Sequence, residues 1–209
     1  MTVDRTAALV LAGGKAARMG GGDKPLLTLG GRTMLASVIA ALKVPHIAIS
    51  ANGDIARFAA FGLQVLSDGA FEGQGPLAGL LAGLEWAASI GMTALLTAPG
   101  DTPFLPPGLA EWLTPAPCCV AMQGRRHHLI ALWPVGCATI LRDMLSSPGP
   151  RRVAGLADRI GMRYAEYDVR TDDPFTNVNT PDDLARARVR IENAGALGEH
   201  RSAIRVTNT

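Results

Sequence analysis

Apolar and polar positions alternate in blocks along most of the chain. Apolar runs of strand length are separated by longer stretches that contain helix-capping residues, prolines and terminating glycines. This alternation is typical of βαβ units, in which helices connect parallel strands. The pattern predicts strands at residues 7–12, 46–50, 63–66, 93–98, 118–122, 129–133 and 163–168.

Specific residues mark where the helices begin. Thr33 is placed to cap one helix, Pro76 suits the first turn of another, and Thr180-Pro181 combines a cap with a proline at the first helical position. The predicted helices span residues 34–42, 77–90, 137–145, 153–160 and 181–193, with shorter ones that end at residues 60 and 113.

Two stretches refine the expected sheet. Residues 93–98 are apolar apart from threonine, which predicts a central strand buried on both faces. The strands at 118–122 and 129–133 are separated by a polar turn at 123–126, which predicts a hairpin. We therefore predict a three-layer, Rossmann-like α/β fold whose twisted sheet is mainly parallel, with one antiparallel strand. Residues 1–193 form a single domain in this prediction, and residues 194–209 form a flexible tail.

Composition narrows the function classes. The 209 residues carry a net charge of only +2, which gives no signal for a nucleic-acid or membrane partner. The three cysteines, Cys118, Cys119 and Cys137, have no disulfide-framework spacing and are expected to be core thiols. Because the sequence contains neither a signal-peptide pattern nor an apolar run of membrane-spanning length, we expect a cytoplasmic protein.

A glycine-rich basic loop follows the first predicted strand. Residues 13–24 hold five glycines and three cations, Lys15, Arg18 and Lys24. Glycines let backbone N–H groups approach a phosphate chain, and the cations balance its charge. A tight turn alone would need fewer glycines and none of the cations. The loop is not a P-loop, because Ala16 follows Lys15 where a magnesium-binding hydroxyl would stand.

Carboxylate and amide residues follow other predicted strands. Asp101 comes after the buried strand at 93–98 and is a candidate Mg²⁺ ligand, although a turn aspartate has the same signature. Asn52 and Asp68 lie where a loop could bind a base or ribose, but each alone is also a common turn residue. Asn177 and Asn179 are two apart in an expected extended segment, so both side chains point to one side.

These motifs together resemble a known enzyme family. The opening loop, which reads LAGGKAARMG at 11–20 and DKPL at 23–26, resembles the signature of nucleotidyltransferases that act on small phosphorylated acceptors. Within that superfamily it is most similar to the molybdenum cofactor guanylyltransferases. The resemblance covers roughly residues 7–190, and further matching positions are Asn52, Asp68, 75–79, 101–104 and 177–184.

The resemblance implies a reaction and a set of site residues. The reaction is transfer of GMP from GTP to the terminal phosphate of molybdopterin carrying molybdenum, with release of pyrophosphate. The resemblance also implies that Asp101 holds a Mg²⁺ ion. The implied catalytic residues are Arg18, Lys24 and Asp101. The implied nucleotide- and substrate-binding residues are Leu11, Ala12, Gly13, Gly14, Lys15, Lys24, Asn52, Asp68, Gly75, Gly79, Asn177 and Asn179. GTP and molybdopterin are thus the expected partners, and the lability of the cofactor makes handover from another cofactor-synthesis or acceptor protein plausible.

Three other functions remain open from the sequence. They are a cytidylyltransferase for the same cofactor, a sugar-phosphate nucleotidyltransferase and a non-catalytic nucleotide-binding regulator. Gly13-Gly14 favours GTP over CTP, since similar cytidylyltransferases usually have alanine then glycine and the missing methyl group leaves room for a purine. The joint presence of Asp101 and the late asparagines speaks against a regulator.

Two basic pairs have no single interpretation. His127-His128 is followed by Leu129, where similar proteins usually have proline, so the pair is either a substrate contact or a solvated turn. Arg151-Arg152 resembles a basic pair of the family that could meet the acceptor phosphate.

Overall fold

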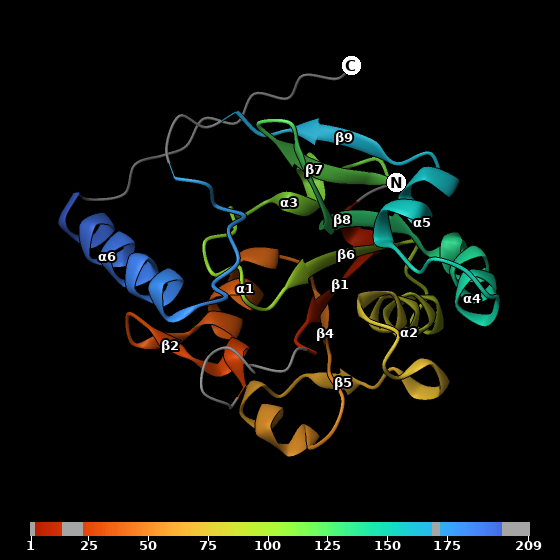
Figure 1. Cartoon of the computed structure of the whole chain (residues 1–209), viewed down its shortest axis with the longest axis horizontal. Coiled ribbons are helices and arrows are strands. Elements are labelled where there is room, and N and C mark those ends of the chain that lie inside the picture. The colour runs from red at the N-terminus through yellow and green to blue at the C-terminus, as the bar shows by residue number, and fades with distance from the viewer. Residues whose placement is uncertain (1–2, 14–22, 169–171, 198–209) are drawn as a thin grey trace.

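A twisted sheet forms the centre of the protein in this computed structural model, which describes residues 3–13, 23–168 and 172–197 (Figure 1). Within those residues the sheet has seven strands, and β8 is antiparallel to both neighbours while the other pairs are parallel. In spatial order the strands are β5 (Gln64–Leu66), β4 (His46–Ser50), β1 (Thr6–Leu11), β6 (Ala94–Pro99), β8 (Arg125–Pro134), β7 (Cys118–Met122) and β9 (Arg163–Glu166). The predicted sheet is confirmed.

Helices cover both faces of this sheet (Figure 1). On one face lie α1 (Met34–Leu42) and α3 (Leu109–Trp112), and on the other lie α2 (Pro76–Ser89), α4 (Ala138–Ser146) and α5 (Val153–Arg159). The last helix, α6 (Pro181–Leu197), packs instead against a small hairpin of β2 (Thr28–Leu29) and β3 (Arg32–Thr33). No helix of the described residues has both the length and the apolarity that a membrane crossing requires.

Strand β1 shows why its sequence is a continuous apolar run. Ala8 and Val10 belong to the core beneath α1, whereas Ala7 and Leu9 belong to the core beneath α2. All four are fully buried, because a strand with helices on both sides exposes neither of its alternating faces to water. Helix α2 approaches closely: a Cβ added at Gly83 would lie 2.5 Å from Leu9 Cδ2.

The predicted helix starts are confirmed by their hydrogen bonds. The Thr33 hydroxyl accepts from Ala36 N at 3.1 Å and caps α1. At α6, the Thr180 hydroxyl accepts from Asp183 N at 3.1 Å, and the Asp183 carboxylate accepts from Thr180 N at 2.9 Å. This reciprocal pair satisfies donors that the first helical turn leaves unpaired.

Some predicted boundaries are wrong. The turn between β7 and β8 takes only Gln123 and Gly124, both with positive φ (49° and 76°), so Arg125 already lies in β8. Two positive-φ residues form the tight turn that matches the twist of a hairpin. Helix α6 runs to Leu197 instead of ending near residue 193. The remainder of the predicted tail, residues 198–209, lies outside the described residues.

Candidate active site

The loops after β1, β4 and β6 are joined by backbone hydrogen bonds at the carboxyl edge of the sheet. Ala12 N donates to Ser50 O at 2.9 Å, and Gly100 N donates to Leu11 O at 2.9 Å. Gly13 lies next to the same Ser50 carbonyl, since a Cβ added at Gly13 would lie 3.9 Å from Ser50 O. Three predicted nucleotide-binding positions, Leu11, Ala12 and Gly13, are therefore fixed at the edge where open α/β sheets bind ligands.

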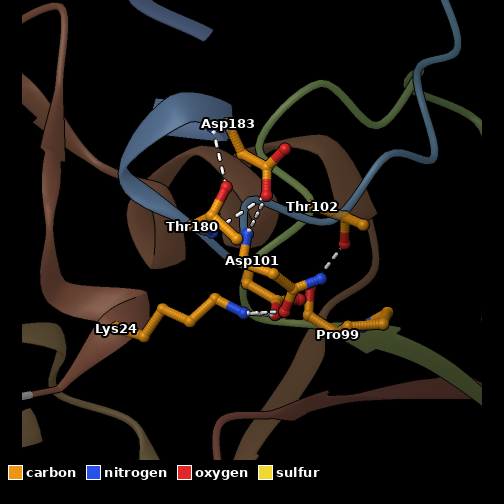
Figure 2. Close-up of polar contacts among 7 residues, drawn as sticks. Lys24, Pro99, Asp101, Thr102, Thr180 and Asp183 are labelled. Carbon is orange, nitrogen blue, oxygen red and sulfur yellow. Dashed lines mark hydrogen bonds and ion pairs between the residues drawn. The ribbon is translucent and has the colours of Figure 1, made fainter. Parts of the chain in front are cut away.

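Three predicted site residues meet next to this edge, and Figure 2 labels two of them, Lys24 and Asp101. Lys24 Nζ donates to Asp101 Oδ2 and to Asn179 Oδ1, which joins three segments far apart in the chain. The Lys24 and Asp101 side chains are only 13% and 17% exposed. Lys24 opens the 3₁₀ turn η2 (Lys24–Leu26), whose buried Pro25 packs so close to Gly100 that a Cβ on Gly100 would lie 3.2 Å from Pro25 Cβ.

Backbone contacts hold the Asp101 segment in place. The buried Thr102 hydroxyl donates to Pro99 O at 2.6 Å (Figure 2), and Asp101 O accepts from Val178 N at 2.9 Å. Asp101 is thereby linked both to the end of β6 and to the segment that carries the late asparagines.

The two carboxylate oxygens of Asp101 have different surroundings. Oδ2 accepts from Lys24, whereas Oδ1 is buried and has no hydrogen-bond partner among the described residues. A buried oxygen without a partner costs free energy that a cation could recover. The described residues contain no group of three or more His, Cys, Asp or Glu that could hold a metal. A single carboxylate fits Mg²⁺, which commonly takes one or two carboxylates and completes its shell with phosphate oxygens and water.

The segment 174–180 carries the two late asparagines on either side of a buried valine. Val178 is buried against α6 and the β2–β3 hairpin, whereas Asn177 is half-buried and Asn179 is exposed. Burial would raise the pKa of Asp183, but hydrogen bonds from Asn179 N, Thr180 N, the Thr180 hydroxyl and Arg186 outweigh it and lower that pKa. The ionised carboxylate of Asp183 therefore ties Asn179 to the start of α6.

Asn52 and Asp68 form a second cluster at the same edge. Asn52 Nδ2 donates to Asp68 Oδ2 at 2.7 Å, while Asn52 Oδ1 accepts from Asp68 N at 2.9 Å. Only this orientation of the amide satisfies both bonds. Asn52 consequently fixes the direction of the Asp68 carboxylate.

Helix α2 packs closely against this cluster through Gly79. A Cβ at Gly79 would lie 2.2 Å from Ser50 Oγ and 3.3 Å from Asp68 Oδ1, so a larger residue would displace both. Gly75 precedes the helix with φ +72° and ψ −159°, a conformation essentially restricted to glycine.

The two histidines lie in β8, and the alternative of a solvated turn is wrong. His127 is 9% exposed, and its ring centroid lies 5.3 Å from that of Phe175. Burial lowers the pKa values of His127 and His128. His128 packs edge-on against Tyr164, and Arg126 stacks over that ring at 4.1 Å. The sequence pattern did not reveal these contacts, because it placed residues 123–126 in the turn. The tight two-residue turn depends on a positive φ at Gln123, which is unusual for a residue other than glycine.

Not every predicted residue can be placed. Gly14, Lys15 and Arg18 lie outside the described residues. Arg151 and Arg152 are exposed before α5, and Arg151 donates to Ser147 O at 3.4 Å.

An open cavity of about 540 Å³ lies between α6 and the segment 172–178. Thr176 and Val178 line it, and these alternate along the chain with Asn177 and Asn179. Neither Asn177 nor Asn179 lines the cavity. Lys24 and Asp101 do not line it.

Comparisons with known proteins agree with this geometry. Residues 8–160 match the MobA-like NTP transferase domain. The chain is 54% identical over 183 residues to a molybdenum cofactor guanylyltransferase of Acidiphilium cryptum, covering 86% of this chain and 92% of the relative. It is 49% identical over 185 residues to one of Cereibacter sphaeroides, covering 86% and 93%.

A solved structure supports the fold. Molybdopterin-guanine dinucleotide biosynthesis protein A from Archaeoglobus fulgidus superposes with a TM-score of 0.70 at 22% identity, covering 90% of this chain and 99% of that one. The family expected from the opening loop and the five later motifs is confirmed: this chain belongs to the MobA-like nucleotidyltransferases.

Proposed function

We propose that this nucleotidyltransferase transfers GMP from GTP to the terminal phosphate of molybdopterin carrying molybdenum. The observation that carries the proposal is the Lys24–Asp101–Asn179 cluster beside the backbone of 11–13. The cluster combines a cation, a carboxylate whose second oxygen has no hydrogen-bond partner among the described residues, and an amide, and in this proposal these groups contact the phosphates of the nucleotide. Relatives at 54% and 49% identity carry the name molybdenum cofactor guanylyltransferase, which supports the choice of substrates.

The reaction needs positioning more than proton transfer. An oxygen of the acceptor phosphate attacks the α-phosphorus of GTP, a new P–O bond forms, and the bond to the β-phosphate oxygen breaks as pyrophosphate leaves. The attacking oxygen is already ionised at neutral pH, so no general base is required. The protein must align the two phosphates and neutralise the charge that develops on pyrophosphate.

The residues of the cluster divide this work. Asp101 would hold Mg²⁺ through Oδ1, with Asn177 and Asn179 as neighbours that orient its bound water or the acceptor. The metal would neutralise charge on the phosphates of GTP. Lys24, and Arg18 in the same loop, stabilise the leaving pyrophosphate. The Lys24–Asp101 pair keeps the ammonium group in place before substrate arrives.

The second cluster would bind the nucleoside. A carboxylate can accept from two neighbouring N–H groups of guanine, and Asn52 holds Asp68 in one direction for this contact. The absence of a side chain at Gly79 lets Ser50 and the Asp68 carboxylate pack against α2, which places that carboxylate beside the helix. In this proposal Asp68 therefore recognises the base, and Asn52 positions the Asp68 carboxylate.

The cysteines support a reducing compartment, which we take to be the cytoplasm. Cys118, Cys119 and Cys137 are free and buried. Burial raises the pKa of Cys119 to about 12 and that of Cys137 to about 11, so both remain thiols at neutral pH.

Pyrophosphate release is the direct test. The purified protein is incubated with Mg²⁺ and each of GTP, ATP, CTP and UTP, with and without molybdenum-loaded molybdopterin. We expect release only with GTP and the acceptor, together with a guanine dinucleotide product detected by mass. A preference for CTP would overturn the guanylyl assignment. Nucleotide binding with no turnover of any triphosphate would instead indicate a regulator.

A further inference from the structure

Arg57 contacts Asn52, which belongs to one cluster of the site, and Asp23, which precedes Lys24 of the other cluster. It belongs to the 3₁₀ segment η3 (Ile55–Phe61), and its side chain is 21% exposed. Its Nε lies 2.9 Å from Asp23 Oδ2, and its Nη2 donates to Asn52 O at 2.9 Å. Its Nη1 donates to Asp54 O. One guanidinium group thus joins the loop before Lys24 to the loop after β4.

On the phosphate side, Asp23 is the residue immediately before Lys24. Its carbonyl accepts from Leu26 N at 2.9 Å and closes the turn η2, while its side chain makes no capping hydrogen bond there. The Asp23 carboxylate instead forms an ion pair with Arg57. The ion pair therefore anchors the backbone from which Lys24 reaches Asp101.

On the nucleoside side, Arg57 holds the backbone of Asn52. The Asn52 amide in turn fixes both the carboxylate and the backbone N–H of Asp68. A chain of contacts therefore runs from Lys24 through Asp23, Arg57 and Asn52 to Asp68.

The chemistry of the side chain suits this place. A guanidinium group has five donors in a rigid plane, so its two Nη atoms can donate to two carbonyls while its charge pairs with a carboxylate, which a lysine ammonium group cannot do in the same directions. Arg57 Nε itself makes no hydrogen bond among the described residues, so Asp23 is held by the ion pair alone. The plane lies over the ring of the buried Phe58, with Cζ 4.6 Å from the ring centroid. That packing limits the rotation of the arginine head.

We propose that Arg57 is a positioning residue that couples the nucleoside-binding cluster to the phosphate-binding cluster. It aligns Lys24 through Asp23, and it aligns Asp68 through Asn52. The inference rests on the proposed transfer of GMP and adds to it a residue that touches neither phosphate nor base. Its consequence is that loss of Arg57 impairs both the chemical step and the binding of GTP.

A double-mutant cycle tests the coupling. Initial rates of GMP transfer give kcat and KM for GTP in wild type, Arg57→Gln, Asp23→Asn and the double variant. We expect each single variant to lower kcat on the order of 10- to 100-fold, because small misplacements of an aligned group have effects of this size. We expect Arg57→Gln also to raise KM for GTP, because the Asn52 carbonyl loses the hydrogen bond from Arg57 Nη2. Asp23→Asn leaves that hydrogen bond in place, so we expect KM to stay unchanged.

The double variant separates a coupled role from two independent ones. If Arg57 acts on Lys24 through Asp23, the double variant loses no more kcat than the worse single variant. Losses that multiply would overturn the proposal, as would a wild-type kcat in Arg57→Gln. Arg57→Lys keeps the charge but not the fork, so we expect it to remain impaired, and full activity in that variant would also contradict the proposal.

Two controls keep the outcomes distinct. Arg142 pairs with Glu85 on the surface with its side chain 55% exposed, so Arg142→Gln should leave kcat and KM unchanged. Thermal melts of each variant show whether it is folded at the assay temperature. If Arg57→Gln is unfolded at that temperature, Asp23→Asn still tests the proposal, because an unchanged kcat in Asp23→Asn contradicts it. If the wild-type protein transferred no GMP, that result would contradict the proposed function, and it would do so whatever the role of Arg57.

Discussion

Lys24 contacts Asp101 across 77 positions of the chain, and the ion pair is largely shielded from water. The pair brings the end of the glycine-rich loop against the end of β6. Attraction between partly buried charges is stronger than on the surface, where exposed pairs contribute roughly 0–1 kcal/mol. This contact is therefore the natural place to test whether the two loops form one catalytic site.

Replacing Asp101 by Asn should abolish GMP transfer while leaving the fold intact. The amide keeps the shape of the side chain but removes the charge that a Mg²⁺ ion and Lys24 require. Steady-state pyrophosphate release measures the loss, and circular dichroism checks the fold. The matched control is Glu85→Gln, which removes a carboxylate from a surface ion pair and should not change the rate. Near wild-type activity in Asp101→Asn would eliminate the proposed metal site.

Replacing Lys24 by Ala should lower kcat by about 10²- to 10³-fold with little change in KM for GTP. This magnitude is typical for removal of one preorganised donor that stabilises charge in the transition state. Lys43 provides the control, since it is exposed at the end of α1 and Lys43→Ala should behave like wild type. An increase in KM alone would make Lys24 a ground-state binding residue.

The sequence predicts the parallel sheet edge because its signals are local. Asn52, Asp68 and Asp101 each follow a short apolar run, and parallel strands place their carboxyl ends together. Caps such as Thr33 are equally local. These signals determine which residues share the edge.

The contacts within the site are not local and could not be predicted in this way. The bonds from Asn52 to Asp68 and from Arg57 to Asp23 depend on how β4, β5 and the glycine-rich loop pack in space. Arg57 has no motif around it that distinguishes it from a surface arginine. The β2–β3 hairpin is absent from the predicted strands, although a local signal was present, since Gly30-Gly31 supplies the two positive φ angles of a tight turn.

The buried His127 should make stability fall in mild acid. Burial lowers the pKa of His127 below its ordinary value of 6.5, so the unfolded chain binds a proton first as the pH drops. The stabilisation is fully present above pH 6.5 and is lost as the pH falls through the folded-state pKa. We expect His127→Leu to lose less stability than wild type between pH 7.5 and 5.5, measured by urea unfolding. If His127→Leu and wild type lost the same stability over this range, the assignment of the pH dependence to His127 would be wrong.

Replacing Gly79 by Ala should destabilise the protein and weaken GTP binding together. The new methyl group would lie 2.2 Å from Ser50 Oγ and 3.3 Å from Asp68 Oδ1, both beside the proposed nucleoside site. Overpacking of this kind typically costs about 1–3 kcal/mol. Adding Ser50→Ala removes the nearest atom and should restore part of the stability, which urea unfolding measures.

Gly155 provides the matched control for that substitution. It is also a helical glycine, in α5, but the nearest atom to an added Cβ is the flexible end of Met144 at 4.0 Å. Gly155→Ala should therefore stabilise the protein by about 0.5–1 kcal/mol through helix propensity, without changing GTP affinity. If Gly79→Ala gained stability in the same way and bound GTP normally, the close packing of α2 against Ser50 and Asp68 would not matter for the site. The expected contrast between two glycines of the same secondary structure isolates the effect of that packing.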